Sequence, residues 1–228
     1  MKSLIFTLLL ITSTTANVEK TIFLAPPQIN IPLSHPTLTD LNLPTLTPSS
    51  NSSLRTPLAA SFPSPSSPEG SSTWLLLDSL TPSQRYELRI CWAATQPTSF
   101  TLTPYTLDEV FDTPILIQSL NTYSLSLTPP PTPPATQKRE RQSSILLIHI
   151  QSQASYFTSN KTLMSNPPPV TVDLILDPFL LNILPRSLLP TILYIIFIAL
   201  TSLFILAPKI ANWVQGIATT EDIQKKLQ

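Results

Sequence analysis

The sequence predicts a mainly β protein, an irregular sandwich of short strands with Pro- and Ser-rich loops, followed by one C-terminal transmembrane helix. Three observations favour this fold. The 228 residues include 26 prolines but only 2 glycines. Short apolar runs rich in β-branched and aromatic residues alternate with polar stretches. One long apolar segment near the C-terminus carries no charge, in a chain whose charged fraction is 11%, against about 25% in soluble domains.

The first sixteen residues predict a secretory signal peptide. Lys2 precedes the apolar run Leu4–Ile11, and the small residues Thr14 and Ala16 suit cleavage after Ala16. The apolar run is shorter than the roughly 20 residues needed to cross a bilayer. We therefore expect residues 1–16 to be removed and a luminal β domain to occupy residues 17–186.

Several segments of this luminal region have the composition of strands. Residues 86–92 alternate strictly, which places Tyr86, Leu88, Ile90 and Trp92 on one face and the intervening residues on the other. Other runs rich in β-branched and aromatic residues predict further strands. These runs are Thr21–Leu24, Trp74–Leu77, Ser99–Leu102, Tyr123–Leu127, Ile145–Gln151 and Val170–Leu176.

Loops and one helix complete the luminal region. Residues 44–72 contain six prolines and many serines and threonines, and residues 127–142 contain a proline cluster followed by Lys138–Arg141. We expect both stretches to be flexible because they offer little apolar surface to bury. Thr106 and Glu109 have the spacing of a capping box, which predicts a short helix that Pro114 interrupts.

One motif resembles a known family of domains. Leu80, Pro82 and Tyr86, followed by aliphatic residues at 88 and 90, match the signature at one corner of fibronectin type III domains. The resemblance implies a fibronectin type III or immunoglobulin-like sandwich in which Tyr86 hydrogen-bonds to upstream backbone, the structural tyrosine corner. It covers residues 74–104. The tryptophan of the family's strand B has no counterpart before Trp74, and further strands follow the motif.

The second long apolar segment predicts the membrane span. Residues 187–207 carry no charge, lie between Arg186 and Lys209, and are long enough to cross the hydrocarbon core of a bilayer. Together with the signal peptide they predict a single-pass type I protein with its N-terminus in the lumen and a cytosolic tail at residues 208–228. Polar residues follow the span, which excludes a GPI-attachment signal.

The tail ends with Lys225 and Lys226 at the fourth and third positions from the C-terminus. This spacing resembles the dilysine KKxx signal of type I endoplasmic-reticulum proteins that the COPI coat retrieves. The resemblance implies residence in the endoplasmic-reticulum membrane. Asn51 and Asn160 begin N-glycosylation sequons, and both lie on the side of the span that is predicted to be luminal.

The composition excludes several kinds of chemistry. Two glycines cannot build a phosphate-binding loop, and one cysteine with two histidines cannot build a Cys-based zinc site, so no cofactor is expected. A net charge of zero argues against nucleic acid. An acid–base pair could be drawn from the acidic residues Asp108, Glu109 and Asp112 with His35 or His149, but the acidic group is more simply a helix N-terminus. Cys91 is either a buried thiol or an intermolecular disulfide.

The segment Asp177–Arg186, which precedes the span, is strongly apolar and contains two prolines. It is expected to lie on the bilayer interface or against a membrane partner.

The layout is similar to that of small accessory subunits of endoplasmic-reticulum complexes. Examples are the subunit that stabilises the first mannosyltransferase of GPI-anchor synthesis and the luminal subunits of the translocon-associated complex. The preferred hypothesis is a non-catalytic glycoprotein that binds and stabilises a multi-spanning membrane protein. A cargo receptor or chaperone that cycles with COPI is the alternative, and a luminal enzyme comes third.

Overall fold

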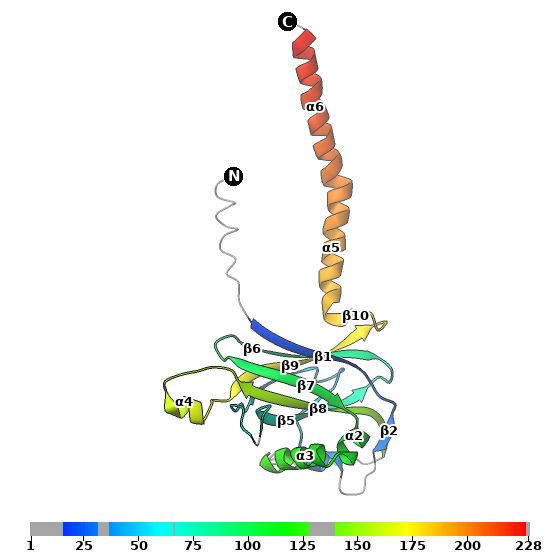
Figure 1. The fold of residues 1–228 in the computed structure, drawn as a ribbon. Coiled ribbons are helices and arrows are strands. Elements are labelled where there is room, and N and C mark those ends of the chain that lie inside the picture. Colours follow the sequence, from blue (N-terminus) through cyan, green and yellow to red (C-terminus); the bar gives the residue numbers. More distant parts are fainter. Residues whose placement is uncertain (1–15, 32–36, 66, 128–139, 227–228) are drawn as a thin grey trace. The chain divides into compact units, whose positions relative to one another are not determined.

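The computed structural model describes residues 16–31, 37–65, 67–127 and 140–226, with side chains from residue 17 to residue 216. The chain divides between Ile183 and Leu184 into two compact units. The predicted signal peptide, except Ala16, lies outside the described residues. The first unit is a β-sandwich with a helical layer, and the second is one helix that follows two short elements (Figure 1).

Within the first unit, the first sheet contains four antiparallel strands in the order β1–β6–β9–β4. Their bounds are Ala16–Leu24 for β1, Arg85–Ala93 for β6, Val170–Leu180 for β9 and Ser53–Leu58 for β4. In the sequence, β1 and β4 precede β5, whereas β6 and β9 follow it. The pairings of β1 with β6 and of β4 with β9 therefore join segments that β5 separates in the sequence. The register of β6 with β9 sets Leu88 opposite Leu176 and Ile90 opposite Leu174.

The second sheet is built around two long neighbouring strands, β5 and β8, which pair antiparallel. Strand β7 pairs with one part of β8 and β2 with another, while β3 runs parallel to β5. Their bounds are Ser71–Leu80 for β5, Arg141–Ala154 for β8, Thr98–Tyr105 for β7, Ile29–Ile31 for β2 and Thr45–Leu46 for β3.

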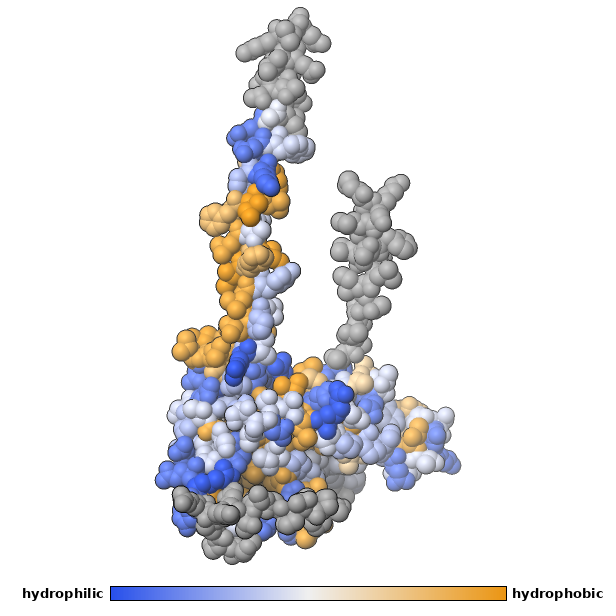
Figure 2. All heavy atoms as spheres, turned by 180° about the vertical axis from the view of Figure 1, so that it is seen from behind, coloured by the Kyte–Doolittle hydropathy of each residue, from blue (hydrophilic) through white to orange (hydrophobic). Residues whose placement is uncertain are grey.

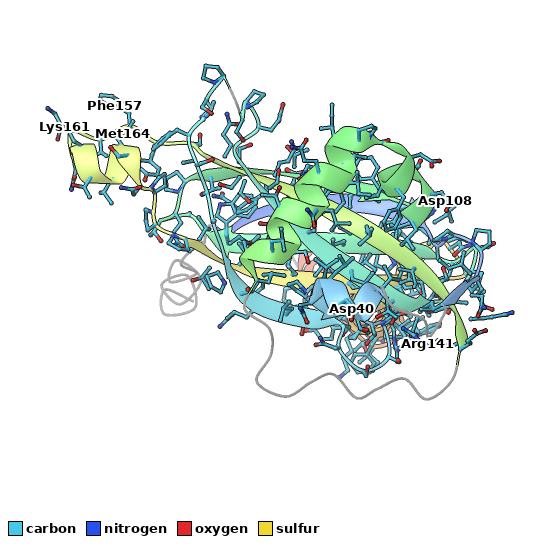
Figure 3. All side chains as sticks on the ribbon, turned by 90° about the horizontal axis from the view of Figure 1, so that it is seen from below. Asp40, Asp108, Arg141, Phe157, Lys161 and Met164 are labelled. Carbon is cyan, nitrogen blue, oxygen red and sulfur yellow. The ribbon has the colours of Figure 1, made fainter. Side chains whose placement is uncertain are left out.

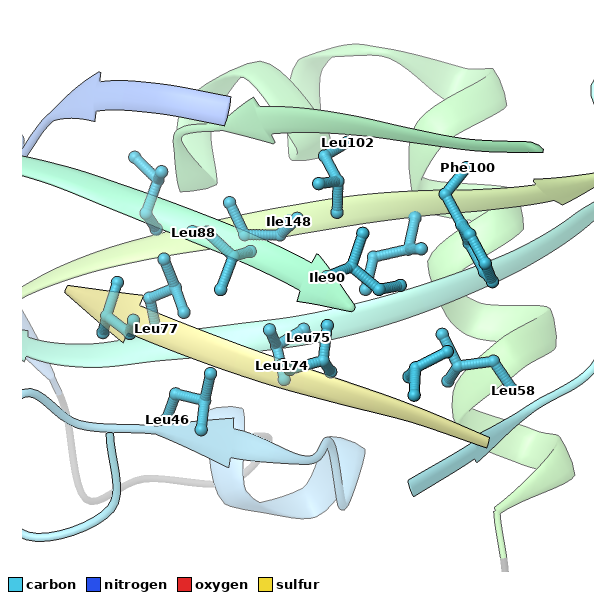
Figure 4. Close-up of a cluster of buried hydrophobic side chains, with 14 of the residues drawn as sticks. Leu46, Leu58, Leu75, Leu77, Leu88, Ile90, Phe100, Leu102, Ile148 and Leu174 are labelled. Atoms are coloured by element: carbon cyan, nitrogen blue, oxygen red, sulfur yellow. The ribbon is translucent and has the colours of Figure 1, made fainter. Parts of the chain in front are cut away.

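The main hydrophobic core lies between the two sheets (Figure 4). The predicted alternation in β6 is confirmed, because Tyr86, Leu88, Ile90 and Trp92 are all buried in this core. Inward-facing side chains of β5, β7, β8 and β9 meet them. The mainly β fold class with one C-terminal apolar helix is therefore confirmed.

A second apolar cluster lies on the opposite face of the second sheet, beneath a layer of helices. The layer comprises η1 (Leu38–Leu41), α2 (Leu107–Asp112) and α3 (Pro114–Ser126). Figure 3 shows α3 crossing the strands of this sheet. Because β5 and β8 are covered on both faces, they read as unbroken apolar runs such as Leu75–Leu77 and Ile145–Ile148.

The capping box at α2 is present as predicted. The Thr106 hydroxyl accepts from the backbone N–H of Glu109, and the Glu109 carboxylate accepts from the backbone N–H of Thr106. Pro114 then starts α3, where the missing N–H of a first-turn proline is harmless. Among the described residues of this unit the remaining helix is α4 (Lys161–Ser165), which Asn160 caps.

Two sequence-based expectations about the first unit were wrong. Tyr123–Leu127 was expected to be a strand, but Tyr123–Ser126 completes α3, where Leu120 and Tyr123 pack onto the second sheet. A short apolar run does not distinguish a strand from one face of a helix. Outside these residues, the predicted strands lie within β1, β5, β6, β7, β8 and β9.

Residues 44–72 were expected to be a flexible loop, but they contain β3 and β4. Leu46, Leu58 and Ala60 are buried in the main core, so a few apolar side chains suffice to fix a stretch rich in proline and serine. Gly70 is needed there, because it has φ +82 and an added Cβ would lie 2.2 Å from the Ser152 carbonyl oxygen.

Of the other expected loop, 127–142, residues 128–139 lie outside the described part of the chain. Its end is ordered. Arg141 is the first residue of β8 and pairs with the carboxylate of Asp78, while Ser143 also donates to Asp78 at 2.7 Å. Arg141, at the end of this stretch, is therefore part of the sandwich.

The second unit is a helix that extends beyond the predicted span. Short segments β10 (Leu184–Pro185) and η2 (Arg186–Leu188) lead into α5 (Leu189–Thr201), the π-helical η3 (Ser202–Leu206) and α6 (Ala207–Lys226). The stretch Arg186–Gly216 is long and apolar enough to cross a membrane. Figure 2 shows its apolar side chains in orange. The π turn precedes Pro208, whose missing N–H and ring disturb the preceding α-helical turn.

Candidate surfaces for partner binding

The carboxylate of Glu109, one of the candidate acid–base residues, is engaged in the helix cap. It accepts from the Thr106 backbone N–H at 2.7 Å and from the Thr106 hydroxyl at 2.9 Å. These bonds lower the pKa of the carboxyl, the backbone bond most strongly. Glu109 therefore carries out the structural role that the capping-box pattern predicts. Asp108 and Asp112 belong to the same short helix.

His149 lies in β8 under the helical layer, packed against Trp74 with the two rings stacked 4.6 Å apart. Its Nε2 is buried and has no hydrogen-bond partner among the described residues. Burial lowers the pKa of this imidazole to about 4, so the ring is neutral at physiological pH. His35 lies outside the described residues. Nowhere in the described ranges do three His, Cys, Asp or Glu side chains gather to hold a metal.

Cys91 lies on the outer face of the first sheet, opposite Val18 of β1 and Asp173 of β9. The thiol is half-buried and free of disulfides within the chain. Burial raises the pKa of the thiol, with the nearby Arg89 acting in the opposite direction. The group therefore stays protonated at neutral pH and is a weak nucleophile.

The tyrosine of the fibronectin-like motif is buried, with 1% of its surface exposed. Its hydroxyl accepts a hydrogen bond from the backbone N–H of Thr81 at 3.0 Å and donates one to Gln84 Oε1. Leu80 is buried in the same core. Tyr86 thus ties the loop between β5 and β6, which includes Pro82, to the strand that follows it.

The two sequon asparagines lie in different local structures. Asn51 is exposed, and its side-chain amide donates to the carbonyl oxygen of Thr45 at 2.9 Å. The Asn160 side chain accepts from the backbone N–H groups of Thr162 and Leu163 at the start of α4. At the other end of the chain, the backbone of Lys225 and Lys226 continues α6, whereas the sequence favoured a flexible tail. Their side chains lie outside the described part.

The outer face of the first sheet carries a network of charged side chains. Glu87 accepts from Lys20 at 3.2 Å and pairs with Arg89 at 3.0 Å, and Arg89 also pairs with Asp177 at 3.3 Å. Both carboxylates are buried although they face away from the core. Charges buried in this way need close partners, which the alternation of acidic and basic residues across β1, β6 and β9 supplies.

Apolar side chains border this network on β1. Val18, Ile22 and Leu24 are 51%, 50% and 58% exposed. Ile22 and Leu24 flank the inward-facing Phe23 and lie opposite the charged residues Glu87 and Arg85 of β6, whereas Val18 lies opposite Cys91. This face therefore combines fixed charges with accessible apolar surface, a composition shared by many protein interfaces.

A hollow of about 690 Å³ lies between β2, η1, α2 and α3. Its volume is within the range of small-molecule sites. Most of its lining is apolar, and the side-chain amides of Asn30, Gln118 and Asn121 are among its polar groups. The apolar members include Ile29, Ile31, Leu38, Leu107, Phe111 and Leu120.

Comparison with known proteins decides between the classes of function that the sequence left open. Residues 8–209 match the model of the family described as Pga1, GPI-mannosyltransferase II co-activator. The chain belongs to this family. The Pga1 family is one of co-activators rather than catalytic enzymes, so the expectation of a non-catalytic accessory subunit is confirmed at this level.

A curated relative supports the assignment over a shorter stretch. The chain is 39% identical over 64 residues to a GPI mannosyltransferase 2 subunit of Schizosaccharomyces pombe. The aligned stretch is 25% of this chain and spans about a third (36%) of the relative's length. No solved structure matches the chain, so the fibronectin type III resemblance stays a prediction.

The Pga1 match includes nearly all of the sandwich and most of the apolar helix, and it stops at residue 209. GPI-anchor synthesis was one of the two settings that the layout suggested, but the accessory subunit used as the example serves the first mannosyltransferase rather than the second. Sequence reasoning also missed the charged network. The network joins Glu87 and Arg89 of β6 to acidic residues of β9. It can be recognised only when the pairing of these two strands is known.

Proposed function

We propose that this chain is a single-pass accessory subunit that binds the catalytic subunit of GPI mannosyltransferase II in the endoplasmic-reticulum membrane and supports its activity. The family match over residues 8–209 carries the proposal. It includes the sandwich and most of the long apolar helix, the two parts that a luminal subunit held beside a membrane enzyme requires. The relative from Schizosaccharomyces pombe bears the name of a subunit of the same enzyme.

The test is purification of the tagged full-length chain in mild detergent. We expect one multi-spanning protein, the catalytic subunit, in near-equal amount. Cells depleted of the chain should accumulate the glycolipid that lacks the mannose added by this enzyme. Many clients in small amounts, without that glycolipid, would support the alternative of a cargo receptor or chaperone.

The same proposal includes a type I orientation, with residues 17–186 in the lumen as a fibronectin-like glycoprotein domain. Asn51 and Asn160 would then carry glycans. Because Asn160 caps α4, it should not itself be replaced. Thr162→Ala and Ser53→Ala each remove one sequon and leave the asparagine side chain in place. Each variant should run faster on a gel by one glycan, and sequons that are never used would count against the luminal orientation.

Retrieval by the COPI coat through Lys225 and Lys226 completes the proposed localisation. Replacing both lysines by serine should release the chain from the endoplasmic reticulum into later secretory compartments, as seen by microscopy. The catalytic subunit could hold the chain in place without COPI, so the test is made with the chain in excess over that subunit. Unchanged localisation under these conditions would exclude the dilysine signal.

A further inference from the structure

The strand β9 ends in a turn with an unusual backbone. The N–H of Ile183 donates to the carbonyl oxygen of Leu180 at 3.1 Å, and the two central residues have positive φ, 52 for Leu181 and 59 for Asn182. Two successive residues with positive φ define a type I′ turn, which favours glycine, asparagine and aspartate. Asn182 suits its position. Leu181 does not, because the Cβ of a leucine is crowded in the left-handed region.

Neighbouring residues hold this turn in place. The Asn182 side chain accepts from the backbone N–H of Arg85 at 2.7 Å and donates to the carbonyl oxygen of Ser83 at 3.0 Å. Gln84 donates to the carbonyl oxygen of Phe179 at 3.0 Å. The Asn182 side chain is thus bound to the loop between β5 and β6 and to the first residue of β6. These bonds and the bond from Gln84 to Phe179 hold the strained backbone of the turn in place.

Two apolar side chains extend from this turn into solvent. Leu181 is 92% exposed and Ile183 is 79% exposed. A leucine at this position does not stabilise the fold. Its exposed side chain contacts no core residue, and a smaller residue would fit the strained backbone of the turn better. Such outliers are typical of functional positions. This combination of strain and exposure favours a contact of the Leu181 side chain outside the sandwich.

The sequence that follows limits what this contact can be. Ile183 is six residues before Leu189, where α5 begins, and six extended residues reach about 20 Å at most. The turn cannot lie far from the membrane that the helix crosses. No acidic residue occurs between Asp177 and that helix, and the exposed Arg186 can interact with lipid phosphates. Binding sites for proteins centre on aromatic or Arg anchors with a polar rim, whereas the exposed apolar side chains of this turn, Leu180, Leu181 and Ile183, are all aliphatic.

We propose that the Leu180–Ile183 turn inserts Leu181 and Ile183 into the lipid interface of the luminal leaflet. The chain would then contact the membrane at two places, this turn and the apolar helix. This inference goes beyond the proposed function, because it requires no mannosyltransferase. The strain at Leu181 is then offset by the burial of its side chain in lipid. The contact restricts the height and tilt of the sandwich over the bilayer.

The experiment uses the full-length chain in phosphatidylcholine nanodiscs. Cys91 is replaced by serine, and a polarity-sensitive fluorophore is attached through Leu181→Cys. Phe157→Cys provides the control, because Phe157 is 90% exposed and lies near α4 (Figure 3), before the start of β9 rather than at its end. We expect blue-shifted emission at 181 and several-fold stronger quenching by nitroxide-labelled lipids than at 157.

Equal quenching at the two positions would overturn the proposal. So would a fluorophore at 181 that becomes shielded only when the catalytic subunit is added, since the turn would then bind protein. That second result would leave the proposed function intact. Failure of the purification test would leave the lipid contact intact.

A second variant separates lipid contact from folding. Leu181→Asn suits the left-handed backbone and removes the apolar side chain. We expect the denaturation midpoint, followed by the fluorescence of the buried Trp74 and Trp92, to stay the same or to rise. Lipid quenching of a fluorophore at Ile183→Cys should fall towards the level at 157. A lower midpoint would show that Leu181 serves the fold and would overturn the proposal.

Discussion

The two sheets of the sandwich differ in how many of their faces are covered. In the second sheet, β5 and β8 are buried by the main core on one face and by the helical layer on the other. The first sheet has one buried face, and its other face carries the network around Glu87 and the exposed side chains of β1. The sequence shows the same difference. Strands β5 and β8 contain unbroken apolar runs, whereas apolar and polar residues alternate in β6.

This difference separates positions that maintain the fold from positions that are free to change. Substitutions under the helical layer should unfold the first unit, whereas matched substitutions on the outer face of the first sheet should leave it folded. Stability measurements on paired variants of the full-length chain test this separation.

The largest expected effect is at Leu147, which is fully buried in β8 under the helices. Leu147→Ala should lower the free energy of unfolding by about 2–5 kcal/mol through lost burial and the cavity that remains. The matched variant Leu24→Ala, on the open face of β1, should change it by about 0.5 kcal/mol or less. Denaturant titration followed by tryptophan fluorescence measures both. Similar losses at the two sites would show that the open face is covered.

Next in size is the ion pair at the end of β5. Burial raises the pKa of Asp78, but hydrogen bonds from Arg141 and Ser143 outweigh it and hold the pKa below its usual value. Asp78→Asn should cost about 2–3 kcal/mol, since Arg141 loses its counter-charge. The exposed pair Arg55–Asp173, at 2.6 Å in the first sheet, provides the control. Asp173→Asn should cost about 1 kcal/mol at most.

The pH dependence of this pair has a definite sign. A carboxylate whose folded pKa is lowered stabilises the fold above the unfolded value of about 4. That contribution is lost as the pH falls through the folded value. The difference in stability between the native chain and Asp78→Asn should therefore shrink below about pH 4. A difference that stays constant down to pH 2 would show that folding does not lower the pKa of Asp78.

The smallest of the expected fold-stability effects concerns His149. Its folded pKa of about 4 is below the ordinary value of 6.5. The folded chain therefore binds fewer protons than the unfolded chain, and stability falls as the pH drops below 6.5. Between pH 7 and pH 5 the loss should be of the order of 2 kcal/mol. His149→Phe, which keeps a ring against Trp74, should lose less over the same interval. Equal losses would mean that folding does not lower the pKa of His149.

The sequence predicted those parts of the molecule whose signal is local. Alternation located β6, the capping pattern located α2, and the absence of charge located the apolar helix. The other two helices of the layer, η1 and α3, were missed because their signal was indirect: β5 and β8 are apolar on both faces, which requires a covering on each. The strand β4 was missed because its pairing with β9 overrides a composition typical of loops.

The candidate surfaces were less predictable than the fold. The apolar stretch after Asp177 was recognised from its composition, but the positive φ of Leu181 and the bonds of Asn182 depend on the loop between β5 and β6. The charged network needs three strands that are far apart in the sequence. Its members looked like ordinary solvent-facing residues because each was seen without its partners.

The pairing of β4 with β9 also determines when folding can finish. Arg55 of β4 is opposite Asp173 of β9. The edge strand β4 therefore cannot pair until β9, more than a hundred residues later in the sequence, has been synthesised. Strand β9 ends at Leu180, and α5 begins at Leu189. During synthesis on the ribosome, the sheet can close only when the membrane helix is about to emerge. Contacts this distant in sequence form slowly, and until β9 arrives, β4 and one edge of β6 stay exposed and available to chaperones of the compartment.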